Sequence, residues 1–131
     1  MQFKTKLLLA LVAANAFAWS PSASANTSLD AANEQLRAIY NEDAISAHAV
    51  CAAWNGVVGV MLPDDAPRDA WDAILAEGRR HTGKVIAVYG KNLSIEFLEQ
   101  LMEEVQTEYN AKRVSWADLV TGAQACVVIG L

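Results

Sequence analysis

The chain has 131 residues, which is enough for one domain with a single core. Hydrophobic residues make up 53% of it, and its net charge is −5. An acidic chain repels phosphate backbones, so these values exclude nucleic acid as the expected partner.

The N-terminal segment 1–25 has the pattern of a secretory signal peptide. Two lysines precede an apolar run over residues 7–19, and Ala23-Ser24-Ala25 has the A-x-A form of a cleavage site. The run is shorter than the roughly 20 apolar residues that a membrane span needs, although an uncleaved anchor is the alternative. We therefore expect a cut between Ala25 and Asn26, a periplasmic or secreted protein, and no membrane span after cleavage. The remaining domain, 26–131, would be more acidic still, because both lysines are lost.

Apolar or small side chains recur at steps of three and four from Leu36 to Met61. This spacing predicts the longest helix of the protein, with one buried stripe that contains Cys51. The polar run Asn41–Asp43 is where this helix would kink or split in two. The stretch after it is almost uncharged as far as Pro63, which predicts a central helix covered on several sides.

Three more helices are expected. One begins near Pro67 and ends at Gly90, a predicted left-handed C-cap. The next begins at the N-cap Ser94 and runs to about Asn110. The last begins at Ser115, the start of a capping box, and runs to about Ile129, with Asp118 as the other half of the box.

Short connections join these segments and favour antiparallel neighbours. We therefore predict an all-α fold, a small bundle of about four helices. Trp54, Trp71 and Trp116 fall on the apolar stripes and are expected in the core.

The two cysteines predict a disulfide, because both would remain in an exported chain. The one intramolecular pairing is Cys51–Cys126, which closes a loop of about 75 residues and is worth roughly 4 kcal/mol in the chain-entropy model. Two free buried thiols, or a bond between two chains, are the alternatives. Both cysteines lie on apolar helical stripes that could face each other, which favours the intramolecular bond.

Catalytic and metal-binding patterns are weak. His48 and Cys51 stand three residues apart on one helix, a spacing that suits a shared metal or a nucleophile with its base. The chain has only one other histidine, His81, which follows two arginines and is expected on the surface. We therefore predict no catalytic residue, no cofactor and no metal, and an enzyme is the least favoured class.

Charge is segregated along the predicted third helix. Its five glutamates form a candidate partner-binding face that would dock a basic protein. The alternative is a solvated face that makes ordinary surface ion pairs with Arg80 and Lys84 of the preceding helix. The glutamates are Glu96, Glu99, Glu103, Glu104 and Glu108.

The segment Cys51-Ala-Ala-Trp54-Asn-Gly56-Val-Val resembles the Cys–aromatic–Gly helix of periplasmic immunity proteins that neutralise type VI secretion effectors. The resemblance is confined to this segment. It implies a small, helical, disulfide-bearing protein that acts by binding another protein, as an immunity protein, an inhibitor or a chaperone-like protein does. The alternative function is binding of a small ligand in a cavity between helices.

Overall fold

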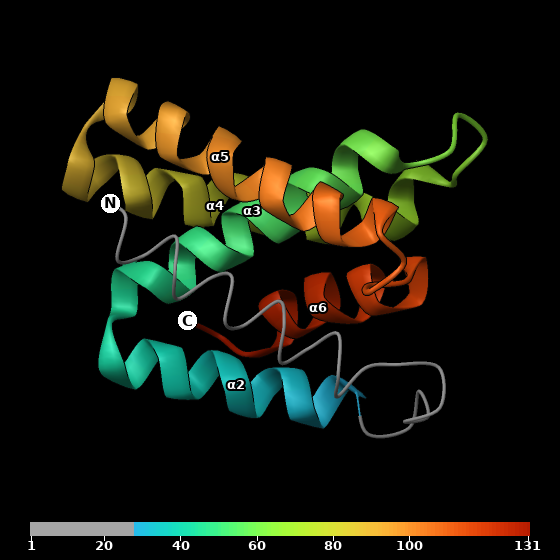
Figure 1. Cartoon of the computed structure of the whole chain (residues 1–131), viewed down its shortest axis with the longest axis horizontal. Coiled ribbons are helices and arrows are strands. Elements are labelled where there is room, and N and C mark those ends of the chain that lie inside the picture. The colour runs from blue at the N-terminus through green and yellow to red at the C-terminus, as the bar shows by residue number, and fades with distance from the viewer. Residues whose placement is uncertain (1–27) are drawn as a thin grey trace.

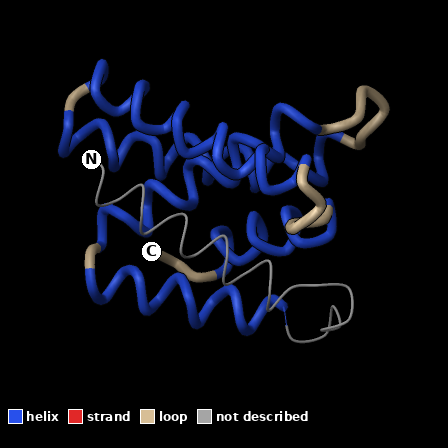
Figure 2. Tube along the Cα trace, viewed as in Figure 1, coloured by secondary structure: helices blue, strands red, loops and turns tan. Residues whose placement is uncertain are grey.

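The computed structural model describes residues 28–131, so the predicted signal peptide and the Ala25–Asn26 junction lie outside the described residues. Within this range the fold is all-α, as predicted, with five helices and no strand (Figures 1 and 2). The helices are α2 (Ser28–Glu42), α3 (Ala44–Met61), α4 (Arg68–Tyr89), α5 (Lys91–Asn110) and α6 (Trp116–Val128).

Helix α3 is the centre of the bundle. It packs against each of the other four described helices, with α4 and α5 on one side and α2 and α6 on the other (Figure 1). It is also the one helix in residues 28–131 that is long and apolar enough to cross a membrane by length and composition, and 67% of it is buried inside the fold. A helix that is covered on all sides needs the same composition.

The described chain has five helices rather than four because the expected first helix splits at Asp43. This residue is extended, with φ −154° and ψ 99°, and it is the N-cap of α3. Its carboxylate Oδ2 accepts a hydrogen bond from the Ser46 hydroxyl at 2.8 Å, and its carbonyl accepts from the Ser46 amide at 3.1 Å. A short polar side chain that bonds the following turn favours a helix start over a helix interior. The helix expected from Leu36 to Met61 is therefore split in two at the polar run Asn41–Asp43, which was one of the two predicted outcomes there. The longest described helix is α4, with 22 residues, and not this segment.

Gly90 forms the sharp turn between α4 and α5. Gly90 is the C-cap of α4, as predicted, and its positive φ of 82° is a conformation that glycine adopts most readily. Its ψ of 165° is extended, so the predicted left-handed helical conformation is not the one observed. Helix α5 begins immediately afterwards at Lys91, and the Ser94 amide donates to the Gly90 carbonyl at 3.1 Å. Ser94 is buried inside the helix, so its prediction as the N-cap is wrong.

The predicted capping box at the start of α6 is confirmed. The Asp118 amide donates to the Ser115 hydroxyl at 3.1 Å, and the Ser115 amide donates to the Asp118 carboxylate at 2.8 Å. These two bonds satisfy donors that the first helical turn leaves unpaired.

A disulfide joins the centre of α3 to α6. Cys51 and Cys126 are both buried, and their Cα atoms lie 5.6 Å apart, within bridging range. The predicted Cys51–Cys126 pairing is therefore present. The neighbouring Trp54 is buried as expected, and its indole N–H donates to the Leu119 carbonyl at 2.8 Å. Trp71 and Trp116 are only half-buried and lie against each other, with ring centroids 6.2 Å apart.

Candidate functional site: a groove over the central helix

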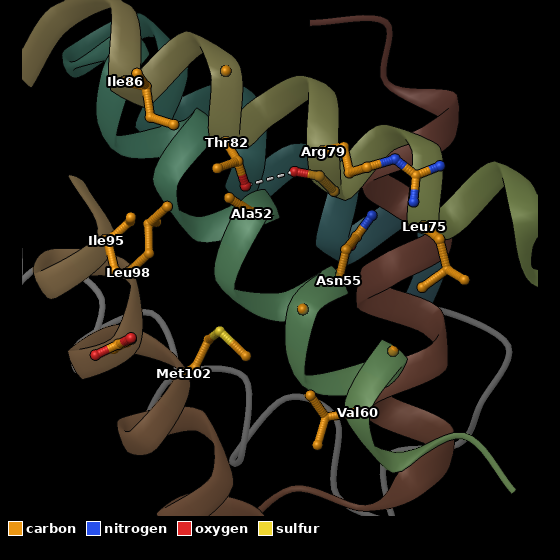
Figure 3. Close-up of a pocket in the computed structure, with 15 residues that line it drawn as sticks. Ala52, Asn55, Val60, Leu75, Arg79, Thr82, Ile86, Ile95, Leu98 and Met102 are labelled. Carbon is orange, nitrogen blue, oxygen red and sulfur yellow. Dashed lines mark hydrogen bonds between the residues drawn. The ribbon is translucent and has the colours of Figure 1, made fainter. Parts of the chain in front are cut away.

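An apolar groove of about 580 Å³ opens between α3, α4 and α5. Helix α3 forms its floor, and α4 and α5 form its two walls (Figure 3). This size lies within the range of pockets that bind small ligands or anchor side chains. The lining residues are Ala52, Asn55, Gly56, Gly59 and Val60 on α3, Leu75, Gly78, Arg79, Thr82, Gly83 and Ile86 on α4, and Ile95, Leu98, Glu99 and Met102 on α5.

Small residues on α3 and α4 account for the hollow. A Cβ atom at Gly59 would meet the Leu75 side chain at 2.8 Å, and one at Gly56 would meet Met102 at 3.1 Å. These glycines let the walls approach the floor closely, with no side chain of the floor rising between them. Gly83 is different, because a Cβ there would meet no atom within 4 Å. Position 83 therefore faces open space in the groove.

The polar groups of the groove are few. Asn55 is buried at the floor and donates from Nδ2 to the Ile74 carbonyl at 2.9 Å, which ties α3 to α4. The Thr82 hydroxyl donates to the Gly78 carbonyl of its own helix at 2.8 Å (Figure 3). Two exposed charged residues line the groove on opposite walls, Arg79 on α4 and Glu99 on α5.

A second hollow of about 290 Å³ extends the groove toward the loop between α3 and α4. The two hollows share Gly59, Val60 and Leu75. Along the α4 wall the combined lining runs from Arg68 to Ile86. At 1.5 Å per residue this is about 27 Å, the length of an 18-residue helix. The site is therefore elongated rather than compact.

Apolar surface is exposed at both parts of this site. Val60, at the junction of the two hollows, is 72% exposed, and Ile95 on the α5 wall is 41% exposed. Such exposed apolar surface beside a groove is typical of a binding site, whereas scattered single residues need no explanation.

The five glutamates of the candidate partner-binding face are all on α5, where they do not all line the same hollow. Glu99 lines the groove, whereas Glu103, Glu104 and Glu108 line a separate shallow hollow on α5. Glu96 is exposed and lines neither.

Of the three glutamates that line this shallow hollow, Glu108 forms an ion pair with Arg113, whereas the buried Oε2 atom of Glu104 accepts no hydrogen bond from the described residues. Glu108 accepts two hydrogen bonds from the Arg113 guanidinium, which lowers the pKa of its carboxyl group. Burial, together with the neighbouring Glu103, raises the pKa of Glu104. On α4, Arg80 pairs with Glu77 of its own helix and donates to the Leu131 carbonyl, rather than reaching the glutamates of α5.

A buried histidine pair joins α3 to α4 next to the groove. The Nδ1 atoms of His48 and His81 lie 2.8 Å apart, and His81 is completely buried. The expected surface position of His81 is therefore wrong. His81 lies on the side of α4 that faces the core, next to His48 of α3. The two arginines that precede His81 in the sequence do not determine which side of α4 faces the core.

Both histidines are neutral near pH 7. Burial lowers the pKa of His81 to about 4, helped by Arg80 and His48 and opposed by a hydrogen bond with the Cys126 backbone and by the Glu77 carboxylate. Burial is also the main cause that lowers the pKa of His48. The Glu77 carboxylate lies 3.5 Å from His81 Nε2. Between the two Nδ1 atoms one ring donates and the other accepts, and the tautomers decide which.

The other sequence hypotheses for His48 and Cys51 depend on a free thiol. Cys51 is in the disulfide, so it is neither a metal ligand nor a nucleophile in this structure. A search of the described residues finds no group of three or more histidine, cysteine, aspartate or glutamate side chains that could hold a metal ion.

From the sequence, a cavity between helices was expected only in the alternative function, the binding of a small ligand. The glycines of α3 and α4 that line the groove are the signal in the sequence that could have indicated it. The histidine pair had no local signal, because its members are 33 residues apart. No known family model, no curated protein and no solved structure matches this chain.

Proposed function

We propose that the protein is exported and binds another protein by accepting an amphipathic helix of that partner in the groove over α3. The observation that carries this proposal is that two adjacent hollows follow one another along the same face of α4. A helix of about 18 residues matches the 27 Å of groove along α4, and helix-in-groove binding uses apolar anchors at helical spacing. Immunity proteins, inhibitors and chaperones all act through such contacts between proteins.

The groove also supports a specific chemistry for this occupant. Its mostly apolar lining suits apolar side chains of the partner, and open space for such a side chain lies at Gly83 on the α4 wall. Arg79 and Glu99 stand on opposite walls, so an acidic edge facing α4 and a basic edge facing α5 would complement them.

Export is the second part of the proposal. The A-x-A motif before Asn26 supports it, and a disulfide is consistent with an oxidising compartment. These two observations together support a periplasmic or secreted location.

The test places a photo-crosslinking amino acid at position 83, which faces the groove, and at position 73 as the matched control. Ala73 is exposed on the same helix and lines neither hollow. We expect position 83, but not position 73, to capture a partner at one helical segment.

That segment is then synthesised, and its affinity is measured for the wild type, Gly83→Leu and Ala73→Leu. Gly83→Leu fills the groove and should weaken binding by about tenfold or more, which corresponds to about 1.4 kcal/mol. Equal affinity for both variants, or equal capture from both positions, would contradict the proposal.

A small apolar ligand is the second candidate, and the volume of about 580 Å³ favours it. Native mass spectrometry of the purified protein separates the two functions. A bound small molecule that Gly83→Leu removes, in the absence of any captured protein segment, would establish this alternative.

A further inference from the structure

The histidine pair and the disulfide hold the two sides of α3 in different ways. Cys51 joins α3 to α6 through a covalent bond. His48, one turn earlier on α3, joins it to α4 through a hydrogen bond to His81. The first connection does not titrate, whereas the second consists of two titratable rings. Acid therefore acts on the α3–α4 contact and leaves the α3–α6 bond intact.

The number of protons on the pair decides whether the hydrogen bond can exist. Two neutral rings supply one donor and one acceptor across the 2.8 Å between their Nδ1 atoms. A single added proton preserves the bond, because an imidazolium can donate to a neutral imidazole. Two added protons remove it, since both Nδ1 atoms are then donors and both rings carry a positive charge.

The surroundings do not compensate for that second charge. From α4, the cations Arg80 and Lys84 and the single carboxylate of Glu77 act on the pair. From α2, the Tyr40 ring packs edge-on against His48, with centroids 6.0 Å apart. From α6, Cys126 contributes a backbone hydrogen bond and a sulfur that does not titrate.

We propose that the His48–His81 pair is an acid-sensitive latch, which holds α4 against α3 near neutral pH and releases α4 when both rings are protonated. Helix α4 forms one wall of the groove, so its release would also open the site. That consequence for binding rests on the proposed function, whereas the release itself does not.

The direction of the effect follows from the lowered pKa values. A histidine whose pKa is lower in the latched state than in an open one binds protons preferentially when open. Its contribution to the α3–α4 contact is complete above pH 6.5 and is lost as the pH falls toward about 4. For His81 alone, lowering the pH from 7.5 to 4.5 should raise the opening constant on the order of 50-fold.

Amide hydrogen exchange, resolved by helix and corrected for the pH dependence of the intrinsic rate, tests this latch. The comparison is between the wild type and His81→Asn at pH 7.5 and 4.5, without reductant. An asparagine amide can donate or accept, so it can bond to His48 in either protonation state and carries no second charge. We expect acid to lower protection in α4 of the wild type on the order of 50-fold more than in α3 and α6. His81→Asn should show a much smaller difference between the helices.

Imidazole NMR titration of the wild type provides a second measurement that does not depend on how well the variant folds. The two rings should titrate in separate steps below pH 6.5. The amide protection of α4 should be lost over the same pH range as the second step. Two rings that titrate independently near pH 6.5, or equal loss of protection in α3, α4 and α6, would overturn the latch. If α4 loosens in acid while the affinity for the captured partner segment does not change, the latch stands and the groove is not the binding site.

Discussion

Gly122 of α6 is the position where the smallest side chain should have the largest effect on stability. A Cβ atom there would lie 2.7 Å from Cε2 of Trp54 and nearer still to its indole nitrogen. The ring cannot move away easily, because it is 2% exposed and its N–H donates to the Leu119 carbonyl one turn before Gly122. Gly122→Ala must therefore displace Trp54 or shift α6 away from α3.

The cost has three terms. Overpacking a core costs about 1–3 kcal/mol, and leaving the indole N–H and its acceptor unpaired costs about 1–3 kcal/mol. The higher helix propensity of alanine offsets about 1 kcal/mol of this loss in the free energy of unfolding. The net loss is about 1–5 kcal/mol, which for a domain of this size lowers the melting temperature by about 4–25 °C.

The matched control is Gly83→Ala on α4, where the new methyl group meets no atom within 4 Å. Only the propensity term operates there, so this variant should be more stable than the wild type by up to about 1 kcal/mol. Thermal unfolding, followed by circular dichroism without reductant, measures both variants. If Gly122→Ala melts within about 3 °C of the wild type, the packing of Trp54 on α6 described above is wrong.

Three further predictions concern the covalent and local structure. Cys51→Ser and Cys126→Ser should each lower the free energy of unfolding by about 2–5 kcal/mol, and the double variant should be no less stable than either, as denaturant titration will show. Ser115→Ala should cost about 0.5–2 kcal/mol in the same assay, whereas Ser115→Asp, which can also cap a helix, should cost much less. Intact-mass analysis of the exported protein should find Asn26 at its N-terminus, and a cytosolic product that keeps the leader would contradict export.

Local sequence signals predicted the parts of the fold that local interactions decide. Ser115 and Asp118 bond to each other across three residues, so their spacing was sufficient. The disulfide was predictable for a different reason, since two cysteines allow only one intramolecular pairing.

Other features depend on contacts between distant segments. His81 is buried because α4 turns it toward His48, and nothing within the sequence near position 81 shows this. Serine is a common N-cap residue, which is why Ser94 was predicted as the N-cap, but the turn at Gly90 allows α5 to begin four residues earlier. The groove is lined by residues of α3, α4 and α5. It depends on how these three helices pack together, which the sequence of any one of them does not show.

The Cys51–Cys126 bond also determines what one proteolytic cut can do to this molecule. The disulfide closes a covalent ring that contains the α3–α4 loop, where Asp64 and Asp65 are exposed, and the connection between α5 and α6. Exposed loops of this kind are the usual sites of cleavage. A single cut in either of them would open the ring but leave the two fragments joined, with their helices packed as before. The nicked protein would keep its mass, apart from one added water, until a reductant separated the fragments.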